Sequence, residues 1–209
     1  MGRMGLDNLA RRVRVFAVSA FLLVWDDDAL AKKERLREPL IRPSLILAAE
    51  KGYGNACMGR GLFWTALHVI EGDNGGSPIT GWRTGPFFGG AVQVLGRDKD
   101  HDLAWGIATG DFVPSSVLIS KEMPVAGERL WAQALLWQDW QTIRLPHYAF
   151  LVEDDGLLYT DGLSWPGMSG ACLLNEQGEL VAINLGTTVP KSPASMLLPA
   201  SRWAVVVGR

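Results

Sequence analysis

Histidines, cysteines and clustered basic residues are all scarce in this sequence. There are three histidines and two cysteines, and no Cys/His cluster has the spacing of a zinc site, so we expect no metal ion and no other cofactor. The net charge is −2 at pH 7 without a basic block, which gives no indication of nucleic-acid binding. Any chemistry that this chain performs is therefore expected to rest on its own side chains.

A long apolar run is also missing. The N-terminal run, residues 15–25, is too short to span a bilayer comfortably as a helix, so we expect no stable membrane span. Arg11, Arg12 and Arg14 precede this run, and a small-x-small site ending at Ala31 follows it. This layout predicts a secretory signal peptide over residues 1–31 and export to the periplasm or the cell exterior. The aspartates at 26–28 are unusual there, and an interfacial anchor or an amphipathic helix on a cytoplasmic protein is the alternative.

The remaining composition is that of one globular unit. With 209 residues, 48% of them apolar and 20% charged, the chain is long enough to bury a core, and we expect no additional peptide-binding domain. The 24 glycines and 11 prolines are spread along the chain, as in proteins made of many short strands joined by tight turns. One hairpin is predicted in CMGRGLFWTALHV, with Gly59, Arg60 and Gly61 at its tip.

The stretch TDGLSWPGMSG, residues 160–170, contains the first candidate for chemistry. It is followed at once by the apolar run ACLLNEQGELVAINLG. A serine flanked by glycines on a tight turn that leads into a strand has an exposed hydroxyl and bare backbone N–H groups beside it, as acyl transfer requires. Ser169 is therefore a candidate nucleophile. The alternative is an ordinary Gly/Pro/Ser turn between two strands.

A serine nucleophile needs a base, and the base needs an acceptor that holds its tautomer. His68 ends an apolar, strand-like run, which predicts a position at a strand end facing a cleft. His101 lies in a charged stretch, and His147 follows a proline. Asp102 stands where the charged stretch meets the apolar LAWGIA, so the following strand can carry its carboxylate into the protein. Two neighbouring acidic residues are interpreted as solvated turn residues: Asp98 and Asp100.

Three motifs together resemble the trypsin-like serine proteases of chymotrypsin fold. TALHV surrounds His68, HDLAWGIA surrounds Asp102, and PGMSGACLLNEQGELVAINLG surrounds Ser169. The likeness is closest to the bacterial heat-shock (HtrA/Deg) branch, whose serine motif reads roughly T-D-A-x-I-N-P-G-N-S-G-G-P-L-L-N. The order His, Asp, Ser is also that of the family.

The resemblance implies an all-β fold of two antiparallel six-stranded β-barrels with a short C-terminal helix. The protease domain would cover residues 32–209. The first barrel would lie at about 43–112 and the second at about 120–200, and the helix at 200–207 would follow.

The resemblance also implies a serine endopeptidase that hydrolyses peptide bonds of proteins or peptides through an acyl-enzyme. His68 would take the proton from Ser169, and Asp102 would fix the imidazole. The N–H groups of Gly167 and Ser169 would form the oxyanion hole. The alternative is a catalytically inactive relative that serves as a binding or scaffold module.

Three residues depart from the family pattern, at two places beside Ser169. Met168 stands where the family usually has Asp or Asn, but this position contributes backbone more than side chain to the oxyanion hole. Ala171 and Cys172 replace the usual Gly-Pro. A Cβ at Ala171 is expected to crowd a close backbone contact, which is the reason for keeping the inactive alternative.

Substrate preference in this family depends on the pocket for the side chain before the scissile bond. Leu163 occupies the position at the base of that pocket, and the wall strand VAINLG supplies Asn184, Leu185 and Gly186, with Met196 on the far side. An apolar base leaves a cation without a partner, so cleavage after small or medium aliphatic residues is expected. The rival is Asp161, whose carboxylate would favour Arg or Lys.

The cysteines and the tryptophans leave two further questions. Cys57 and Cys172 could form a disulfide between the barrels in an exported protein, but we favour two buried thiols, because sequence alone does not place their Cα atoms within bridging distance.

The nine tryptophans are dispersed, and we favour packing roles over an aromatic binding platform.

Overall fold

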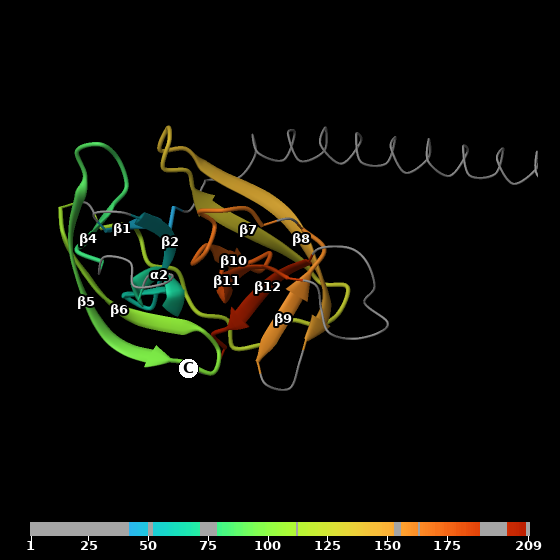
Figure 1. The fold of residues 1–209 in the computed structure, drawn as a ribbon. Coiled ribbons are helices and arrows are strands. Elements are labelled where there is room, and N and C mark those ends of the chain that lie inside the picture. The colour runs from blue at the N-terminus through green and yellow to red at the C-terminus, as the bar shows by residue number, and fades with distance from the viewer. Residues whose placement is uncertain are drawn as a thin grey trace, which may run out of the picture. The chain divides into compact units, whose positions relative to one another are not determined.

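The computed structural model describes residues 42–49, 52–71, 79–111, 113–152, 156–162, 164–188 and 200–207. The predicted signal peptide, Leu163 and Met196 lie outside these residues. The described strands form two closed antiparallel barrels of six strands each, so the predicted all-β fold is confirmed (Figure 1). No helix among the described residues is long and apolar enough to cross a membrane.

The first barrel contains the strands drawn from blue to yellow-green in Figure 1. Its elements are β1 (Ser44–Ala49), β2 (Gly52–Gly59), β3 (Leu62–Ala66), the short helix α2 (Leu67–Glu71), β4 (Gly81–Arg83), β5 (Gly89–Asp98) and β6 (Leu103–Gly110). The strand order is β1-β2-β3-β6-β5-β4, and β4 pairs again with β1. The predicted hairpin joins β2 to β3 through Arg60 and Gly61, whose positive φ angles of 51° and 79° suit the twist of a two-residue hairpin turn.

The second barrel contains the strands drawn from yellow to red. They are β7 (Arg129–Leu135), β8 (Thr142–Val152), β9 (Leu157–Thr160), β10 (Cys172–Leu174), β11 (Leu180–Thr188) and β12 (Ala200–Val205), in the order β10-β11-β12-β9-β8-β7. The predicted C-terminal helix over residues 200–207 is wrong, because β12 pairs with both β11 and β9. The run Trp203 to Val207 is rich in β-branched side chains, which favour a strand, and without β12 both neighbouring strands would have an unpaired edge.

Each barrel has its own core. Leu45, Leu47, Phe63 and Trp82 pack inside the first barrel. Leu130, Leu158, Leu173, Val181 and Trp203 pack inside the second. Trp82 and Trp203 are 1% and 0% exposed, as expected for packing tryptophans, whereas Trp137 is 47% exposed and belongs to a groove described below.

A third apolar cluster joins the two barrels. It combines Trp64 and Leu103 of the first barrel with Leu174 and Ile183 of the second. Cys57 of β2 and Cys172 of β10 lie in this cluster with Cα atoms 5.3 Å apart and form a disulfide. Our preference for two thiols was therefore wrong, because barrel packing brings together two strands that are 115 residues apart in sequence.

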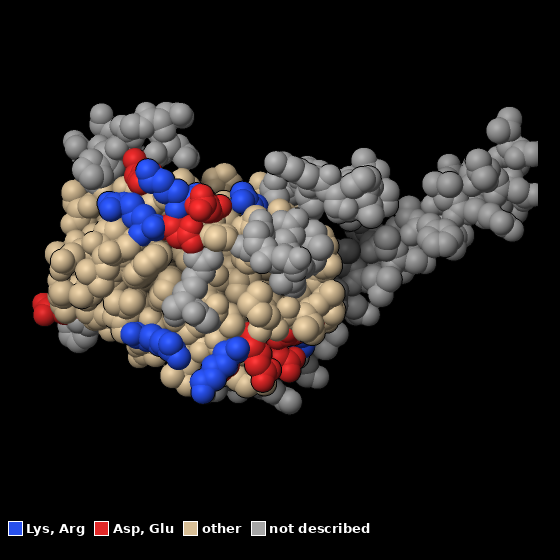
Figure 2. Space-filling model, turned by 90° about the horizontal axis from the view of Figure 1, so that it is seen from below, with Lys and Arg blue, Asp and Glu red and all other residues tan. Residues whose placement is uncertain are grey.

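The charged side chains on one face of the molecule are dispersed. Figure 2 shows small separate groups of basic and acidic residues on one face, with uncharged residues between them.

Candidate active site

His68 and Asp102 come together at one end of the first barrel. Strand β3 ends at Ala66, and His68 is the second residue of α2, not the end of a strand as predicted. Asp102 ends the turn between β5 and β6 with a φ of 53°, a left-handed conformation that aspartate tolerates. Its backbone carbonyl accepts the N–H of Leu67 over 2.8 Å, which ties this turn to the start of α2.

The Asp102 carboxylate holds His68 at two points. Oδ1 accepts the backbone N–H of His68 over 2.9 Å, and Oδ2 lies 2.7 Å from Nδ1 of the ring. With Nδ1 as the donor, Nε2 carries the lone pair that a general base needs. The two side chains are 29% and 31% exposed, so they remain within reach of a substrate.

The other two histidines lie in different settings. His101 Nδ1 is 2.7 Å from Asp98 Oδ2 within the β5–β6 turn, so Asp98 is hydrogen-bonded in this turn, not simply solvated. His147 is buried in the second barrel, where Nδ1 lies 2.7 Å from Thr160 Oγ1 and the ring stands edge-on to Trp203. Burial lowers the pKa of His147 to about 4. His147 is therefore an uncharged core residue at neutral pH.

Ser169 lies on a turn whose shape depends on two glycines. Gly167 and Gly170 have φ angles of 95° and 85°, which side chains with a Cβ rarely adopt. Gly170 donates its N–H to the Asn184 carbonyl of β11 over 2.8 Å. A Cβ on Gly170 would collide with the carbonyl oxygen of Asn55 and the hydroxyl of Thr65, so this turn packs directly on the first barrel.

The backbone of this turn leaves two N–H groups for another acceptor. Met168 donates to the Trp165 carbonyl over 3.0 Å, and Ala171 donates to the Met168 carbonyl over 2.9 Å. Within the described part of the chain, no backbone carbonyl accepts the N–H of Gly167 or of Ser169. These are the two groups that the sequence motif assigns to an oxyanion hole.

Asn55 of β2 links this turn to the first barrel, and sequence reasoning missed it. Its backbone N–H donates to the Ser169 carbonyl and its Nδ2 to the Gly167 carbonyl, each over 2.7 Å. Its Oδ1 accepts the N–H of Leu135 over 2.8 Å, and its backbone carbonyl accepts the Thr65 hydroxyl over 2.7 Å. The only sequence signal was a polar residue inside an apolar strand, which does not reveal its partners.

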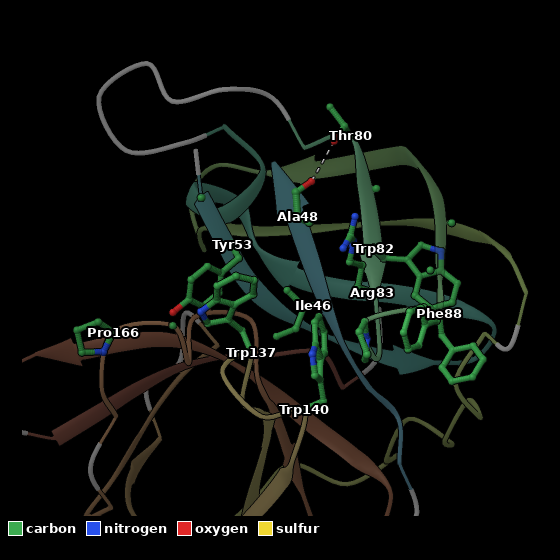
Figure 3. Close-up of a pocket in the computed structure, with 17 residues that line it drawn as sticks. Ile46, Ala48, Tyr53, Thr80, Trp82, Arg83, Phe88, Trp137, Trp140 and Pro166 are labelled. Carbon is green, nitrogen blue, oxygen red and sulfur yellow. Dashed lines mark hydrogen bonds between the residues drawn. The ribbon is translucent and has the colours of Figure 1, made fainter. Parts of the chain in front are cut away.

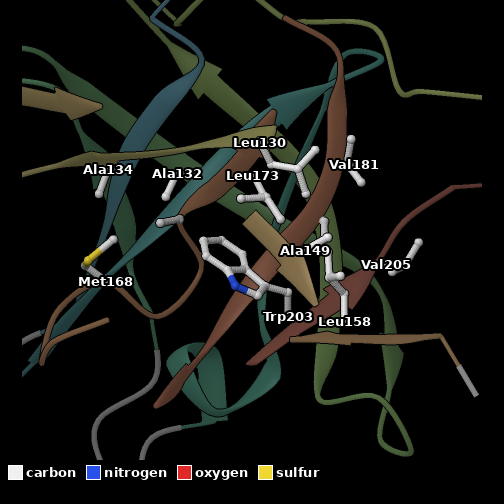
Figure 4. Packing of buried hydrophobic residues seen from close by; sticks show 12 residues of the cluster. Leu130, Ala132, Ala134, Ala149, Leu158, Met168, Leu173, Val181, Trp203 and Val205 are labelled. Atoms are coloured by element: carbon white, nitrogen blue, oxygen red, sulfur yellow. The ribbon is translucent and has the colours of Figure 1, made fainter. Parts of the chain in front are cut away.

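Two of the residues that depart from the family pattern, Met168 and Ala171, belong to the core of the second barrel. Met168 is 1% exposed and points into the core of the second barrel, where Figure 4 shows it near Ala134. Ala171 is fully buried in the same core. Its methyl group therefore belongs to the apolar core of the second barrel.

Three of the residues predicted to receive the substrate are described by the structure, and they lie near Ser169. Asn184 is buried, and its Oδ1 accepts the Ser164 hydroxyl over 2.9 Å. Leu185 and Gly186 lie at an irregularity in the β11–β12 pairing, where Gly186 has a φ of 116°. The rival Asp161 is exposed, and its Oδ1 accepts the backbone N–H of Tyr148 over 2.8 Å. The Asp161 carboxylate is therefore hydrogen-bonded to the backbone of β8.

Comparisons with solved structures agree with this architecture. The Rv3671c protease of M. tuberculosis H37Rv, in an inactive form, matches with a TM-score of 0.59 and 12% identity over 79% of this chain and 84% of that chain. The serine protease of a human pathogenic astrovirus matches with a TM-score of 0.59 and 16% identity over 82% and 93%. A serine endoprotease from Yersinia pestis matches with a TM-score of 0.56 and 19% identity over 78% and 57%.

These likenesses show the fold. The chain has the two-barrel fold of the trypsin-like serine proteases. No protein-family model and no curated protein matches its sequence.

Proposed function

We propose that this protein is a serine endopeptidase that uses Ser169, His68 and Asp102. The observation that carries the proposal is the Asp102 carboxylate holding both the backbone and the ring of His68, on the fold of the trypsin-like proteases. The Ser169 turn also supports it. Gly167, Gly170 and Asn55 fix the shape of this turn, and the N–H groups of Gly167 and Ser169 donate to no backbone carbonyl of the described residues.

The proposed reaction proceeds in two halves. Ser169 Oγ attacks the scissile carbonyl carbon while His68 Nε2 takes the hydroxyl proton, and the N–H groups of Gly167 and Ser169 bind the oxyanion. The imidazolium, which faces the Asp102 carboxylate, then gives that proton to the leaving amine, and the C–N bond breaks. Water, deprotonated by the same histidine, hydrolyses the acyl-enzyme and restores Ser169.

We propose cleavage after small or medium aliphatic residues. Leu163 is assigned to the pocket base by its place in the motif, and Leu185 packs on the apolar cluster between the barrels. Asp161 is held by the Tyr148 N–H, which supports an uncharged pocket. A panel of peptides that differ only at this residue tests the proposal, with graded preference for Val, Ala or Leu expected and preference for Arg or Lys overturning it.

Labelling by a fluorophosphonate tests the catalytic proposal. We expect the wild-type protein to be labelled and to hydrolyse peptides, and Ser169→Ala and His68→Ala to lose both activities while keeping the fold. His101→Ala is the matched control, because His101 also pairs with an aspartate over 2.7 Å. Loss of labelling in His101→Ala together with full activity in His68→Ala would show that the base is misassigned.

A catalytically inactive binding module is the second candidate. The observation that favours it is the Met-Ser-Gly-Ala sequence at 168–171, in which Met168 and Ala171 replace family residues. An unlabelled wild-type protein that still binds peptides would support this candidate against the first.

We also propose that the protein is exported. The pattern in residues 1–31 supports export, and so does the disulfide between Cys57 and Cys172, because disulfides persist in oxidising compartments. Fractionation of cells that express the full chain tests this, with the mature protein expected outside the cytoplasm.

A further inference from the structure

An aromatic groove of about 1250 Å³ lies beside the Ser169 turn. Tyr53, Trp137 and Trp140 line one part of it, and Phe88 lines another (Figure 3). Phe87 is also among the lining residues. Phe87 is 90% exposed, and Trp137 and Phe88 are 47% and 45% exposed. So many large apolar side chains around one hollow are typical of a surface that binds a partner.

The aromatic side chains on one side of the groove pack against one another. The Tyr53 and Trp137 rings stack with centroids 5.2 Å apart, and Trp140 meets Trp137 edge-on at 6.3 Å. Trp140 has a φ of 59°, which is strained for a bulky residue. The loop between β7 and β8 therefore holds this ring against the groove despite its backbone conformation, and Figure 3 shows Trp140 beside Ile46.

The groove begins at the proposed oxyanion hole. Pro166 and Gly167 line it, and a Cβ on Gly167 would lie 3.2 Å from the Tyr53 ring. On the other side of Ser169, Gly170 is bonded to β11, which carries Leu185 and Gly186. Ser169 thus lies between the strand assigned to the acyl part of a substrate and the groove.

We propose that this groove binds the leaving-group segment of a polypeptide substrate and selects an aromatic side chain followed by a carboxylate. The inference rests on the proposed function, because the direction of the bound chain follows from Ser169 as the nucleophile. The leaving segment continues past Gly167 into the groove, where Tyr53 and Trp137 stack on its aromatic side chain.

Arg83 supplies the charge preference. It is exposed on β4, and among the described residues that line the groove it is the one charged side chain. Within the described part of the chain, no carboxylate forms an ion pair with it. A guanidinium in an apolar groove suits a ligand carboxylate, either from Asp or Glu or from a chain terminus.

Strand register gives the spacing between these two features. Asn55 pairs with Ile46, and Ile46 pairs with Arg83, so Arg83 is two strands away from the residue that contacts Ser169. Two strand spacings cover about 10 Å, which is about three residues of extended peptide. The aromatic side chain is therefore expected one or two residues after the scissile bond, and the carboxylate about three residues after it.

Binding to the Ser169→Ala protein tests this inference without catalysis. The probes are labelled peptides with a free N-terminus that represent the leaving segment, with Phe or Ala at the second residue and Glu or Gln at the third. Fluorescence anisotropy should show about tenfold weaker binding when Phe becomes Ala, and the same loss for Trp137→Ala. Arg83→Gln should weaken only the Glu peptides, and Phe150→Ala, an exposed aromatic outside the groove, should change nothing.

The outcomes distinguish a failure of the proposed peptide binding in the groove from a failure of the proposed serine endopeptidase. Peptide binding with these preferences in a protein that never hydrolyses peptides supports the ligand preference of the groove, but it overturns the proposed enzyme and the assignment of the ligand as a leaving segment. In a second outcome, the wild-type protein hydrolyses peptides with no preference for the residues after the scissile bond, while Trp137→Ala binds the peptides unchanged. That result overturns the proposed role of the groove and leaves the proposed enzyme standing. Loss of self-association in Trp137→Ala, without peptide binding, would identify a second copy as the occupant and also overturn the inference.

Discussion

Asn55 of the first barrel donates its backbone N–H to the carbonyl oxygen of Ser169 in the second barrel over 2.7 Å. The same residue holds Gly167 and Leu135 through its side-chain amide. One buried residue therefore connects the proposed nucleophile, the proposed oxyanion hole and the end of β7. This connection makes the shape of the site depend on the contact between the barrels.

Asn55→Asp should disturb positioning more than substrate binding. The carboxylate keeps the size of the side chain but loses both donor bonds, to Gly167 and Leu135. We expect kcat to fall about tenfold or more with little change in KM, and the free energy of unfolding to fall by about 1–3 kcal/mol. Asn175→Asp is the control, because Asn175 ties a distant turn to Glu179. An effect on KM alone would contradict a positioning role.

Asp102→Asn should lower kcat by about 10³-fold to 10⁴-fold while the fold is retained. An amide can present an N–H to Nδ1 of His68, which places the ring proton on Nε2 and removes the base. Asp98→Asn changes the equivalent contact to His101 and should leave activity intact. Steady-state kinetics of the two variants make the comparison, and equal losses in both would refute the assignment of Asp102.

Loss of the Cys57–Cys172 disulfide should destabilise the protein. The bond closes a loop of more than a hundred residues and joins the two barrels within their shared apolar cluster. A double Cys57→Ala, Cys172→Ala variant should lose about 3–5 kcal/mol of unfolding free energy in urea titrations. A reducing agent should destabilise the wild-type protein but not the variant, and identical curves for all four samples would rule out the bond.

Stability should fall in mild acid because of His147. Burial lowers its pKa from 6.5 to about 4, so below pH 6.5 the unfolded chain takes up a proton that the folded protein does not. The loss grows as the pH falls from about 6.5 to about 4 and reaches on the order of 3 kcal/mol. The urea midpoint of His147→Gln should fall less steeply with decreasing pH over this range than that of the wild-type protein. A pH dependence of the urea midpoint that is as steep in His147→Gln as in the wild-type protein would contradict this explanation.

Activity should not require cleavage at an internal site. In trypsin-like enzymes that are activated by proteolysis, a new N-terminus pairs with an aspartate before the serine, but Met168 is buried among apolar side chains and offers no charge. We expect at most removal of the segment through Ala31. N-terminal sequencing of active protein checks this, and an obligatory start beyond Leu45 would be incompatible with it.

The sequence alone predicted the two-barrel fold and which residues are candidates for the triad. His68, Asp102 and Ser169 stand in short motifs whose local pattern is readable, and the Gly-rich turn around Ser169 shows its backbone shape in its composition. The residues of the triad remain a prediction, although the structure pairs His68 with Asp102. The C-terminal strand was missed, because an apolar run of valines next to alanine fits more than one local structure, and only closure of the barrel decides.

Tertiary structure alone decided the disulfide, the role of Asn55 and the groove beside Ser169. Each depends on residues from separate strands: Cys57 meets Cys172 across 115 positions, and Asn55 meets Gly167 across 112. Strand register and the packing of one barrel on the other set these contacts, and neither leaves a local pattern in the sequence. A tryptophan is commonly a core residue, but the position of Trp137 on the loop between β7 and β8 leaves its ring 47% exposed on the wall of the groove.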